Sequence, residues 1–243
     1  MRVPVAAELL DLWEAGMAQP TWEWAAAFIR CAFPELDADA VNAMAIGERD
    51  TRLIEIREAL FGDRLSGCSV CAACGARVEM DLRTSDLRGD SAAVTKESDF
   101  LSGECRVHFR VPTAGDIGEV ARETDVQTMR QALLQRCVLV VERDGRSANL
   151  SELPDETLDG VIGRMAECDP QADVRFELRC PECGESWSEA FDITSYLRTE
   201  LDTWAQRTLQ DVHRLASAYG WRETEVLAVS PQRRSRYLEM IDG

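Results

Sequence analysis

Apolar residues recur at helical spacing through the first sixty residues of the chain. Starting at Leu9 and Leu12, they predict several helices over residues 6 to about 61. Breaks are expected near Gln19-Pro20 and before Pro34, because proline is not tolerated inside a helix. We interpret the apolar residues of these helices as a packed core.

The last fifty residues show the same helical spacing. A continuous apolar face predicts one long helix, which begins at Asp192 or Thr194 and ends at Gly220. Two short helices should follow it. The second of them is expected to begin at Pro231, with Ser230 as its N-cap.

Between these two helical parts, apolar and polar residues alternate in short runs that are typical of β-strands. In the first run, Val78, Met80 and Leu82 point to one face and charged residues to the other. The predicted strands span residues 77–82, 105–111, 174–178 and 187–191, with a further short strand at 138–141 before the turn signal Asp144-Gly145. Residues 82–102 are polar and predict a loop.

Three helices are predicted in the same middle region. Thr113 stands in an N-cap position, and Asp116 follows three residues later, where a capping box has its acidic partner. A second helix runs from near Asp125, and a third from Pro154 to Met165. The chain is therefore expected to be an α+β protein.

Two matching cysteine turns carry the strongest chemical signal. The first is Cys71-Ala72-Ala73-Cys74-Gly75 and the second is Cys180-Pro181-Glu182-Cys183-Gly184. Two intervening residues let both thiolates face one cation, and the following glycine tolerates the positive φ that closes such a turn. A predicted strand follows each turn, so two hairpins meeting around zinc would form a zinc ribbon. We predict one structural zinc per chain, bound by Cys71, Cys74, Cys180 and Cys183.

Three alternatives to this ligand set stay open. In the first, Cys68 replaces Cys71 or Cys74 as a ligand, because Cys68 and Cys71 are also separated by two residues. The pair Cys71 and Cys74, which is followed by glycine, matches the second turn better. A redox dithiol is the second alternative, but such motifs usually open a helix, and strands are predicted here. The third is that the cysteines are merely buried, which two matched turns disfavour. We expect burial in the core for the isolated cysteines Cys31, Cys105, Cys137 and Cys168.

These elements divide the chain into five segments. Helical regions at the N-terminus (1–66) and C-terminus (193–243) flank two short zinc-ribbon hairpins (67–83 and 173–192). A mixed α/β insertion (84–172) separates the hairpins in sequence. Because both hairpins must meet at one metal site, the ends of the insertion are expected to lie close together, and zinc would close a very long loop.

The net charge of the 243-residue chain is −17. Such an acidic surface repels phosphate backbones, so a general nucleic-acid role is disfavoured. Glu8 and Asp11 interrupt any apolar signal-peptide region, and no stretch is long and apolar enough to span a bilayer. We expect a cytoplasmic protein without a membrane partner, whose nine cysteines are reduced and whose clustered cysteines bind metal.

The sequence shows no site for catalysis. Four thiolates would close the coordination of a metal, whereas a catalytic zinc needs an open position and a general base. The two histidines, His108 and His213, are interpreted as ordinary structural residues. No nucleotide-binding or nucleophile-elbow motif is present, so we expect neither an enzyme nor a small-molecule substrate.

Arginines cluster near the end of this acidic chain, at Arg233, Arg234 and Arg236, with Tyr237 beside them. The simpler interpretation is a solvated helix face that pairs with the chain's own carboxylates. The alternative is a docking helix in which these residues contact a partner protein, because arginine and tyrosine often anchor interfaces.

Several stretches occur together with the two cysteine turns: Arg49-Asp50-x-Arg52-Leu53, Glu58-Ala59-Leu60-Phe61-Gly62, Val111-Pro112-Thr113, Met165-Ala166-Glu167-x-Asp169-Pro170, Tyr219-Gly220-Trp221 and Arg236-Tyr237-Leu238. In this order they resemble a family of zinc-ribbon proteins related to the baseplate hub assembly chaperones of T-even-type phages. That family occurs with myophages and phage-derived contractile injection systems. The resemblance covers most of the chain, and the zinc ligands it implies are the four cysteines of the two turns.

The resemblance implies a non-enzymatic assembly factor or scaffold for the baseplate hub of a contractile phage tail or phage-like injection system. The implied partners are hub or spike proteins, held during assembly or in the finished particle. The alternative function is a zinc-ribbon regulator that contacts nucleic acid or a polymerase through the C-terminal arginines. The acidic net charge disfavours that alternative.

Overall fold

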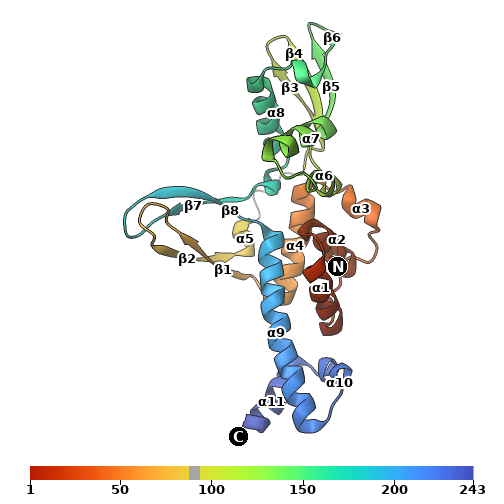
Figure 1. Cartoon of the computed structure of the whole chain (residues 1–243), viewed down its shortest axis with the longest axis vertical. Coiled ribbons are helices and arrows are strands. Elements are labelled where there is room, and N and C mark those ends of the chain that lie inside the picture. Colours follow the sequence, from red (N-terminus) through yellow and green to blue (C-terminus); the bar gives the residue numbers. More distant parts are fainter. Residues whose placement is uncertain (88–93, 243) are drawn as a thin grey trace. The chain divides into compact units, whose positions relative to one another are not determined.

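The computed structural model describes residues 1–87 and 94–242 and divides into two compact units. The first unit joins Met1–Glu35 to Thr194–Gly243, and the second comprises Leu36–Ile193. The boundary after Glu35 falls inside the predicted N-terminal helical region 1–66, because the helices that follow it pack with the middle of the chain. Helices and strands are both present, so the α+β class is confirmed. Figure 1 shows the elements of both units.

The first unit is built from helices. They are α1 (Ala6–Ala18), α2 (Thr21–Ala32), α9 (Ile193–Tyr219, whose first residue belongs to the second unit), α10 (Glu223–Ala228) and α11 (Pro231–Asp242). The breaks expected near Gln19-Pro20 and before Pro34 are confirmed, as is the end of the long helix before Gly220. Within the described ranges, no helix of either unit has the length and apolarity needed to cross a membrane.

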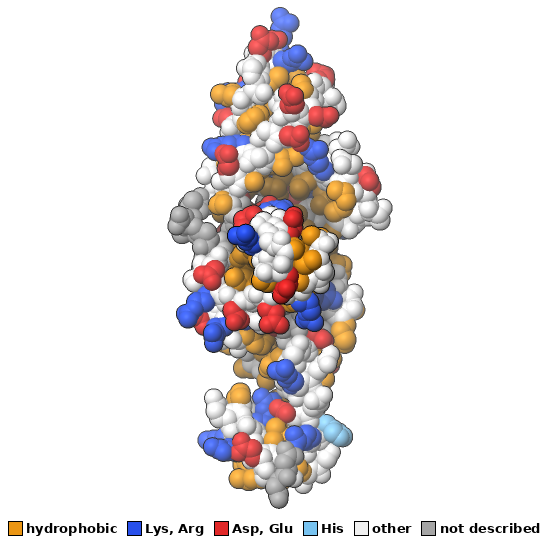
Figure 2. All heavy atoms as spheres, turned by 90° about the vertical axis from the view of Figure 1, so that its left-hand side faces the viewer, with side chains coloured by type: hydrophobic (Ala, Val, Ile, Leu, Met, Phe, Trp, Pro, Cys, Tyr) orange, Lys and Arg blue, Asp and Glu red, His pale blue; other side chains and the backbone are white. Residues whose placement is uncertain are grey.

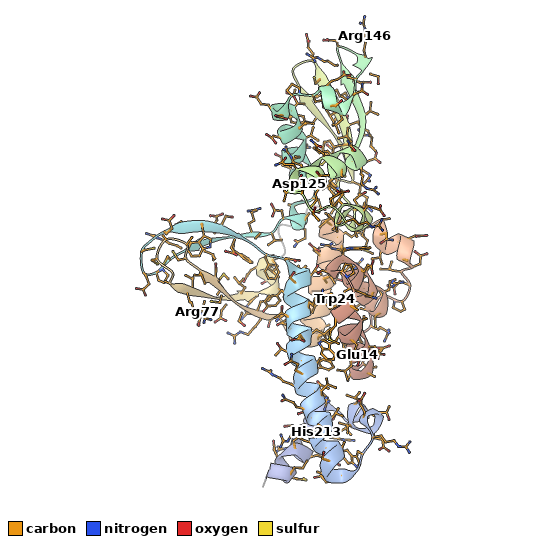
Figure 3. All side chains as sticks on the ribbon, viewed as in Figure 1. Glu14, Trp24, Arg77, Asp125, Arg146 and His213 are labelled. Carbon is orange, nitrogen blue, oxygen red and sulfur yellow. The ribbon has the colours of Figure 1, made fainter. Side chains whose placement is uncertain are left out.

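Trp24 of α2 is central to the packing of α1. Its side chain is completely buried, and its Nε1 donates a hydrogen bond to the carbonyl oxygen of Leu12 at 3.0 Å. Gly16 permits this approach, because a Cβ there would lie 2.8 Å from the indole ring. Trp13 of α1 contacts α9, because its Nε1 donates a hydrogen bond to Asp202 Oδ1 at 2.8 Å. Figure 3 labels Trp24 among the side chains of this region.

A second, smaller core lies where α9, α10 and α11 meet. Val212 and Leu215 of α9 are buried together with Val226 of α10. The rings of Trp221 and Tyr237 pack edge to face, with centroids 5.0 Å apart. The C-terminal helices therefore have an apolar core of their own.

The second unit begins with two helices and contains two separate β-hairpins. Outside the insertion, its elements are α3 (Ala38–Asn42), α4 (Ile46–Phe61), β1 (Arg64–Val70), β2 (Arg77–Arg83), β7 (Arg175–Arg179) and β8 (Ser186–Ala190), and the one-turn helix α5 (Thr84–Leu87) begins the insertion. β1 pairs with β2 and β7 with β8, both antiparallel. Figure 1 shows the two hairpins extending together, with their turns at the same end.

Each hairpin has one apolar face, as the alternation in the sequence predicts. Val78, Met80 and Leu82 of β2 are half-buried, and the charged residues between them are exposed. In the other hairpin, the rings of Phe176 and Phe191 meet edge to face with centroids 5.8 Å apart. These apolar faces are only partly removed from water.

The insertion is a small α/β layer structure. Its elements are β3 (Glu97–Ser102), β4 (Cys105–Arg110), α6 (Ala114–Val120), α7 (Val126–Cys137), β5 (Val138–Arg143), β6 (Arg146–Ser147), the 3-10 turn η1 (Leu150–Glu152), α8 (Asp155–Cys168) and the 3-10 turn η2 (Pro170–Ala172). The strands form an antiparallel sheet in the order β3-β4-β5-β6. Its core joins Val107 and Phe109 of β4 to Leu134 of α7 and Val161 of α8. Figure 1 shows α8 beside the sheet.

Three of the four isolated cysteines are buried, as predicted. Cys105, Cys137 and Cys168 belong to the core of the insertion. Cys31 of α2 is only half-buried, and its sulfur accepts a contact from Arg2 Nη2 at 3.5 Å. It lies at the edge of its helix packing.

The loop predicted over residues 82–102 is wrong in two places. Residues 84–87 form α5, and residues 97–102 form β3. Strand β3 was missed because two of its three inward positions, Ser98 and Ser102, are polar, and Phe100 alone supplies a large inward side chain. Residues 88–93 of the predicted loop lie outside the described residues.

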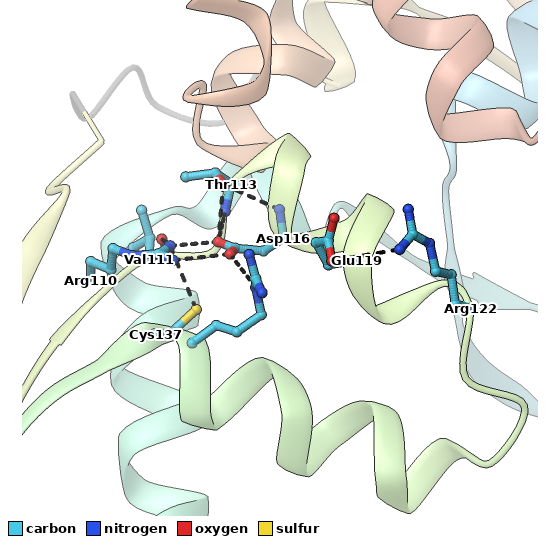
Figure 4. A network of polar contacts seen from close by, with 8 residues as sticks. Arg110, Val111, Thr113, Asp116, Glu119, Arg122 and Cys137 are labelled. Atoms are coloured by element: carbon cyan, nitrogen blue, oxygen red, sulfur yellow. Dashed lines mark hydrogen bonds and ion pairs between the residues drawn. The ribbon is translucent and has the colours of Figure 1, made fainter. Parts of the chain in front are cut away.

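A buried polar network joins β4 to α6 and α7, as Figure 4 shows. The carboxylate of Asp116, 2% exposed, accepts hydrogen bonds from Arg110 Nη2 at 2.9 Å, Arg136 Nε at 2.8 Å and the Thr113 N–H at 2.9 Å. The predicted capping box is thus confirmed and extended by two arginines. Burial would raise the pKa of this carboxyl, but these hydrogen bonds outweigh it and hold the pKa below its usual range.

Candidate metal centre

The two cysteine turns share one backbone conformation. The Gly75 N–H donates to the carbonyl of Cys71 at 2.8 Å, and the Gly184 N–H donates to the carbonyl of Cys180 at 3.0 Å. Gly75 and Gly184 have φ angles of +75° and +78°. Only glycine adopts such angles at little cost, which explains the glycine after each second cysteine. The sequence therefore determines two equivalent turns, one on each hairpin.

The turns bring four sulfur atoms together. Cys71 Sγ lies 3.6 Å from Cys183 Sγ, and Cys74 Sγ lies 3.6 Å from Cys180 Sγ. All four sulfurs lie within 4.8 Å of one another, and we call this group the four-cysteine cluster. In the part of the chain that the structure describes, no other group of three or more cysteine, histidine or acidic residues gathers its ligand atoms in this way. The arrangement is compatible with metal binding.

The electrostatics of the four-cysteine cluster oppose four free thiolates. The backbone N–H of Cys183, helped by that of Glu182, lowers the pKa of the Cys180 thiol to about 7 despite burial. At Cys74 the N–H of Ala76 also favours the thiolate, but the three other sulfurs outweigh it and raise that pKa to about 12. Negative charges at this spacing repel one another, so a cation is required to hold all four cysteines ionised.

A second contact fastens the hairpins beside the sulfurs. Ser69 of β1 donates its hydroxyl to Glu189 Oε2 of β8 at 2.9 Å. The same oxygen accepts from Trp187 Nε1 at 3.1 Å. Strands from the two halves of the second unit are therefore linked by side-chain hydrogen bonds as well as by sulfur contacts.

Cys68 lies outside the four-cysteine cluster. It is exposed on β1, opposite Glu79 of β2, and its sulfur contacts the carbonyl of Ser69 at 3.8 Å. The residue belongs to a strand, whereas Cys71 begins the turn itself. The structure thus brings together the set Cys71, Cys74, Cys180 and Cys183, and leaves Cys68 apart.

The C-terminal residues Arg233, Arg234, Arg236 and Tyr237 do not form one exposed face. Arg233 and Arg236 are exposed, and Arg236 Nη1 lies 2.8 Å from Glu239 Oε2. Arg234 is buried at 6% exposure, and Tyr237 packs in the C-terminal core. Of the three arginines, Arg233 and Arg236 are therefore accessible to a partner in this conformation.

The two histidines lie on different elements. His108 of β4 stands between Asp99 (Nδ1 to Oδ1, 3.3 Å) and Glu97 (Nε2 to Oε2, 3.5 Å) on the outer face of the sheet. His213, labelled in Figure 3, is exposed on α9. Neither belongs to the four-cysteine cluster.

The surface around the hairpin turns carries charges of both signs. Figure 2 looks onto these turns, and acidic and basic side chains are interspersed around them. Figure 3 labels Arg77, which lies at the start of β2 directly after the first cysteine turn. Charged side chains of both signs therefore lie at the hairpin end of the second unit.

Most of the chain matches a known protein family. A model of the T4 bacteriophage base plate protein family matches residues 29–198, more than two thirds of the 243 residues. The chain belongs to this family. No curated protein and no solved structure matches it. The matched range of this base plate family member contains both cysteine turns and the insertion, and it ends near the start of α9.

Sequence reasoning missed one contact between distant residues. Asp169, at the end of α8, accepts a hydrogen bond from the N–H of Gly47 in the first turn of α4 at 2.9 Å. Asp169 lies in a stretch that carries the family resemblance, yet nothing local indicates that it approaches Gly47. Only the packing of η2 against α4 reveals this contact.

Proposed function

We propose that the four-cysteine cluster binds one structural zinc ion per chain. Zinc bonded to thiolates at about 2.3 Å in a tetrahedron places its sulfurs about 3.8 Å apart. The separations Cys71–Cys183 and Cys74–Cys180, each 3.6 Å, are close to that value, and all four sulfurs stay within 4.8 Å of one another. A small contraction of the group would complete a tetrahedral site. Cys71, Cys74, Cys180 and Cys183 are the proposed ligands.

The proposed site is structural because its donors would fill the coordination of zinc. A catalytic zinc keeps one position for water and has a general base nearby. Here four sulfurs converge, and both histidines lie elsewhere. We therefore propose a non-enzymatic protein without a small-molecule substrate.

Metal analysis tests this assignment directly. Protein purified without added metal should contain one zinc per chain, and Cys180→Ser/Cys183→Ser should contain none. Displacement by cobalt would add the visible absorption of a tetrahedral thiolate site. Folded protein that neither retains zinc nor binds cobalt would contradict the zinc proposal and leave a reduced cysteine cluster.

We further propose that this base plate family member is an assembly factor or scaffold for the baseplate hub. Family membership carries this proposal, since a base plate protein must contact other base plate components. The proposed partners are hub or spike proteins, met in the cytoplasm of the producing cell. A zinc-linked pair of hairpins would hold distant parts of the chain in one rigid arrangement for such contacts.

Affinity purification from the producing cell tests the role. Free protein and finished particles are separated first, and partners are identified in each by mass spectrometry. Hub or spike proteins in the free fraction alone would support a transient assembly factor, and recovery in particles would support a structural component. With Cys180→Ser/Cys183→Ser, unchanged particle yield from a folded protein would show that the cysteine link is dispensable.

The alternative role, a zinc-ribbon regulator that contacts nucleic acid or a polymerase, has less support. It relied on the cluster of C-terminal arginines, but Arg234 is buried and Arg236 is paired with Glu239. The net charge of −17 also opposes contact with phosphates. Recovery of nucleic acid or polymerase in the same purification, with steeply salt-dependent binding, would restore this function.

A further inference from the structure

The four-stranded sheet of the insertion has two edges of different kinds. At one edge β6 has only two residues, and the neighbouring β5 carries a bulge at Leu139, where the register with β4 shifts. At the other edge β3 pairs with β4 over six residues without a shift. Short and bulged edges resist the addition of a further strand, whereas a longer regular edge can accept one.

Every second residue of β3 directs its backbone away from β4. The Val111 N–H donates to the carbonyl of Lys96 at 2.9 Å, which places the even-numbered residues on the β4 side. Because antiparallel strands alternate, the N–H and C=O groups of Glu97, Asp99 and Leu101 point outward, and we call these three residues the open edge. Their backbone groups have no hydrogen-bond partner among the residues that the structure describes.

The residues of the open edge also expose their side chains. Leu101 is 71% exposed, and the side chains of Glu97 and Asp99 are 61% and 39% exposed. On the inner face, the ring of Phe100 lies so close to α8 that a Cβ added to Gly160 would be 2.2 Å from it. The strand is therefore held by its inner face and by β4, and its outer backbone groups are fixed in position.

The carboxylates of the open edge are incompletely balanced by basic side chains. Asp99 shares Arg106 with Glu142, at 3.2 Å and 3.8 Å. Glu97 contacts the ring of His108 at 3.5 Å and no lysine or arginine among the described residues. Opposite charges on neighbouring strands stabilise a sheet, so lysine or arginine on an added strand would complement this edge.

A second copy of the chain fits the open edge poorly. An antiparallel pairing of two copies that uses all three outward residues sets Asp99 against Asp99 and Glu97 against Leu101. Like charges directly opposite each other destabilise a sheet. Acidic residues on an edge strand thus act against self-association and leave a basic strand as the better match.

We propose that the open edge of β3 binds an extended segment of another protein, which adds to the sheet as an antiparallel strand. The segment places basic side chains opposite Glu97 and Asp99 and an apolar side chain opposite Leu101. Its backbone supplies the donors and acceptors that the open edge lacks. The surface is separate from the four-cysteine cluster, and only the expectation that the segment comes from a base plate component rests on the proposed function.

Amide hydrogen exchange in dilute, full-length protein tests whether the edge is open. The amides of residues 98, 100 and 102 should exchange at least about tenfold more slowly than those of the open edge, because only the former bond to β4. Open-edge amides that are protected in the monomer would show that the chain itself covers them, which overturns the proposal. Protection that appears as the protein concentration rises would assign the edge to a second copy and overturn it equally.

A synthetic peptide tests the chemistry of the partner. Thr-Val-Thr-Lys-Thr-Arg-Thr, bound antiparallel, places valine opposite Leu101, lysine opposite Asp99 and arginine opposite Glu97. We expect it to protect the open-edge amides with half-saturation on the order of 1 mM or below. The matched peptide with glutamate in place of arginine should bind about threefold more weakly, and Glu97→Lys should reverse that preference. No protection by the basic peptide, or equal binding of both peptides, would overturn the proposal.

Two substitutions of one residue separate the backbone from the side chain. Leu101→Pro removes an outward N–H and no bond to β4, which an edge strand tolerates. Leu101→Ala keeps that N–H, so the proline variant should bind the peptide about fivefold more weakly than the alanine variant. Protected amides at residues 98, 100 and 102 verify that β3 remains folded in both. Equal binding by the two variants would refute strand addition, while affinity purification reports on the assembly role independently.

Discussion

The two hairpins and the insertion between them bury apolar surface in different ways. In the insertion, Val107, Phe109 and Val161 are completely buried behind a four-stranded sheet. In the hairpins, Val78 and Phe176 remain half-buried, because each two-stranded sheet offers only one small face. Two-stranded hairpins are marginally stable by themselves. The sulfur cluster thus occurs where the apolar core is thinnest.

The insertion and the hairpins also differ in how their polar groups are balanced. The insertion contains Asp116, whose buried charge is balanced by Arg110 and Arg136. The hairpins instead bring four sulfurs within 4.8 Å of one another, and four thiolates at this spacing would need a cation to balance them. The buried charge of Asp116 is therefore balanced within the insertion, whereas the hairpins are expected to depend on metal.

The largest expected effect comes from Cys180→Ser/Cys183→Ser. We expect loss of the metal and of amide protection in β1, β2, β7 and β8, since structural zinc contributes on the order of 10 kcal/mol to folding in small zinc domains. The insertion should keep its protection, because its core contains none of these cysteines. Hydrogen exchange with mass spectrometry separates the two regions. Hairpins that stay protected would show that the apolar faces suffice.

Phe109→Ala should produce the next largest effect. The side chain is completely buried in the insertion, and removal of such a ring costs about 3–5 kcal/mol. Denaturant unfolding would measure this loss, and metal content should not change. A loss of metal from this variant would mean that the two regions are not energetically separate.

Phe176→Ala is the matched substitution in a hairpin. Because this ring is half-buried, we expect a loss of about 1–2 kcal/mol, well below that of a fully buried ring. The variant should also release metal to a chelator more readily than the wild type, because Phe176 packs against Phe191 within the second hairpin. A loss of stability as large as that of Phe109→Ala would contradict the conclusion that the hairpins have the weaker apolar core.

Cys68→Ser should have the smallest effect. An exposed strand residue outside the cluster is expected to change stability by no more than about 0.5 kcal/mol and to leave metal content unchanged. Metal analysis and thermal unfolding of this variant are sufficient. Loss of metal would assign Cys68 to the ligand set and displace a neighbouring cysteine.

Local patterns predicted most elements because their causes are local. Helical spacing located α1, α2 and α9, and the capping residues of α6 form the expected hydrogen bonds. The glycine after each cysteine pair predicted the turn, because a positive φ is a property of one residue. Strand β3 was missed since its inward face shows little in the sequence and depends on pairing with β4.

Turn geometry and periodicity act over a few residues, so they alone predict two equivalent cysteine turns and an α+β chain. The meeting of the turns, the separate position of Cys68 and the division between Glu35 and Leu36 became visible only in the folded chain. The same holds for the burial of Arg234 and for the approach of Asp169 to Gly47. Each of these features depends on residues far apart in the chain, and their approach results from the packing of whole elements, which no local pattern encodes.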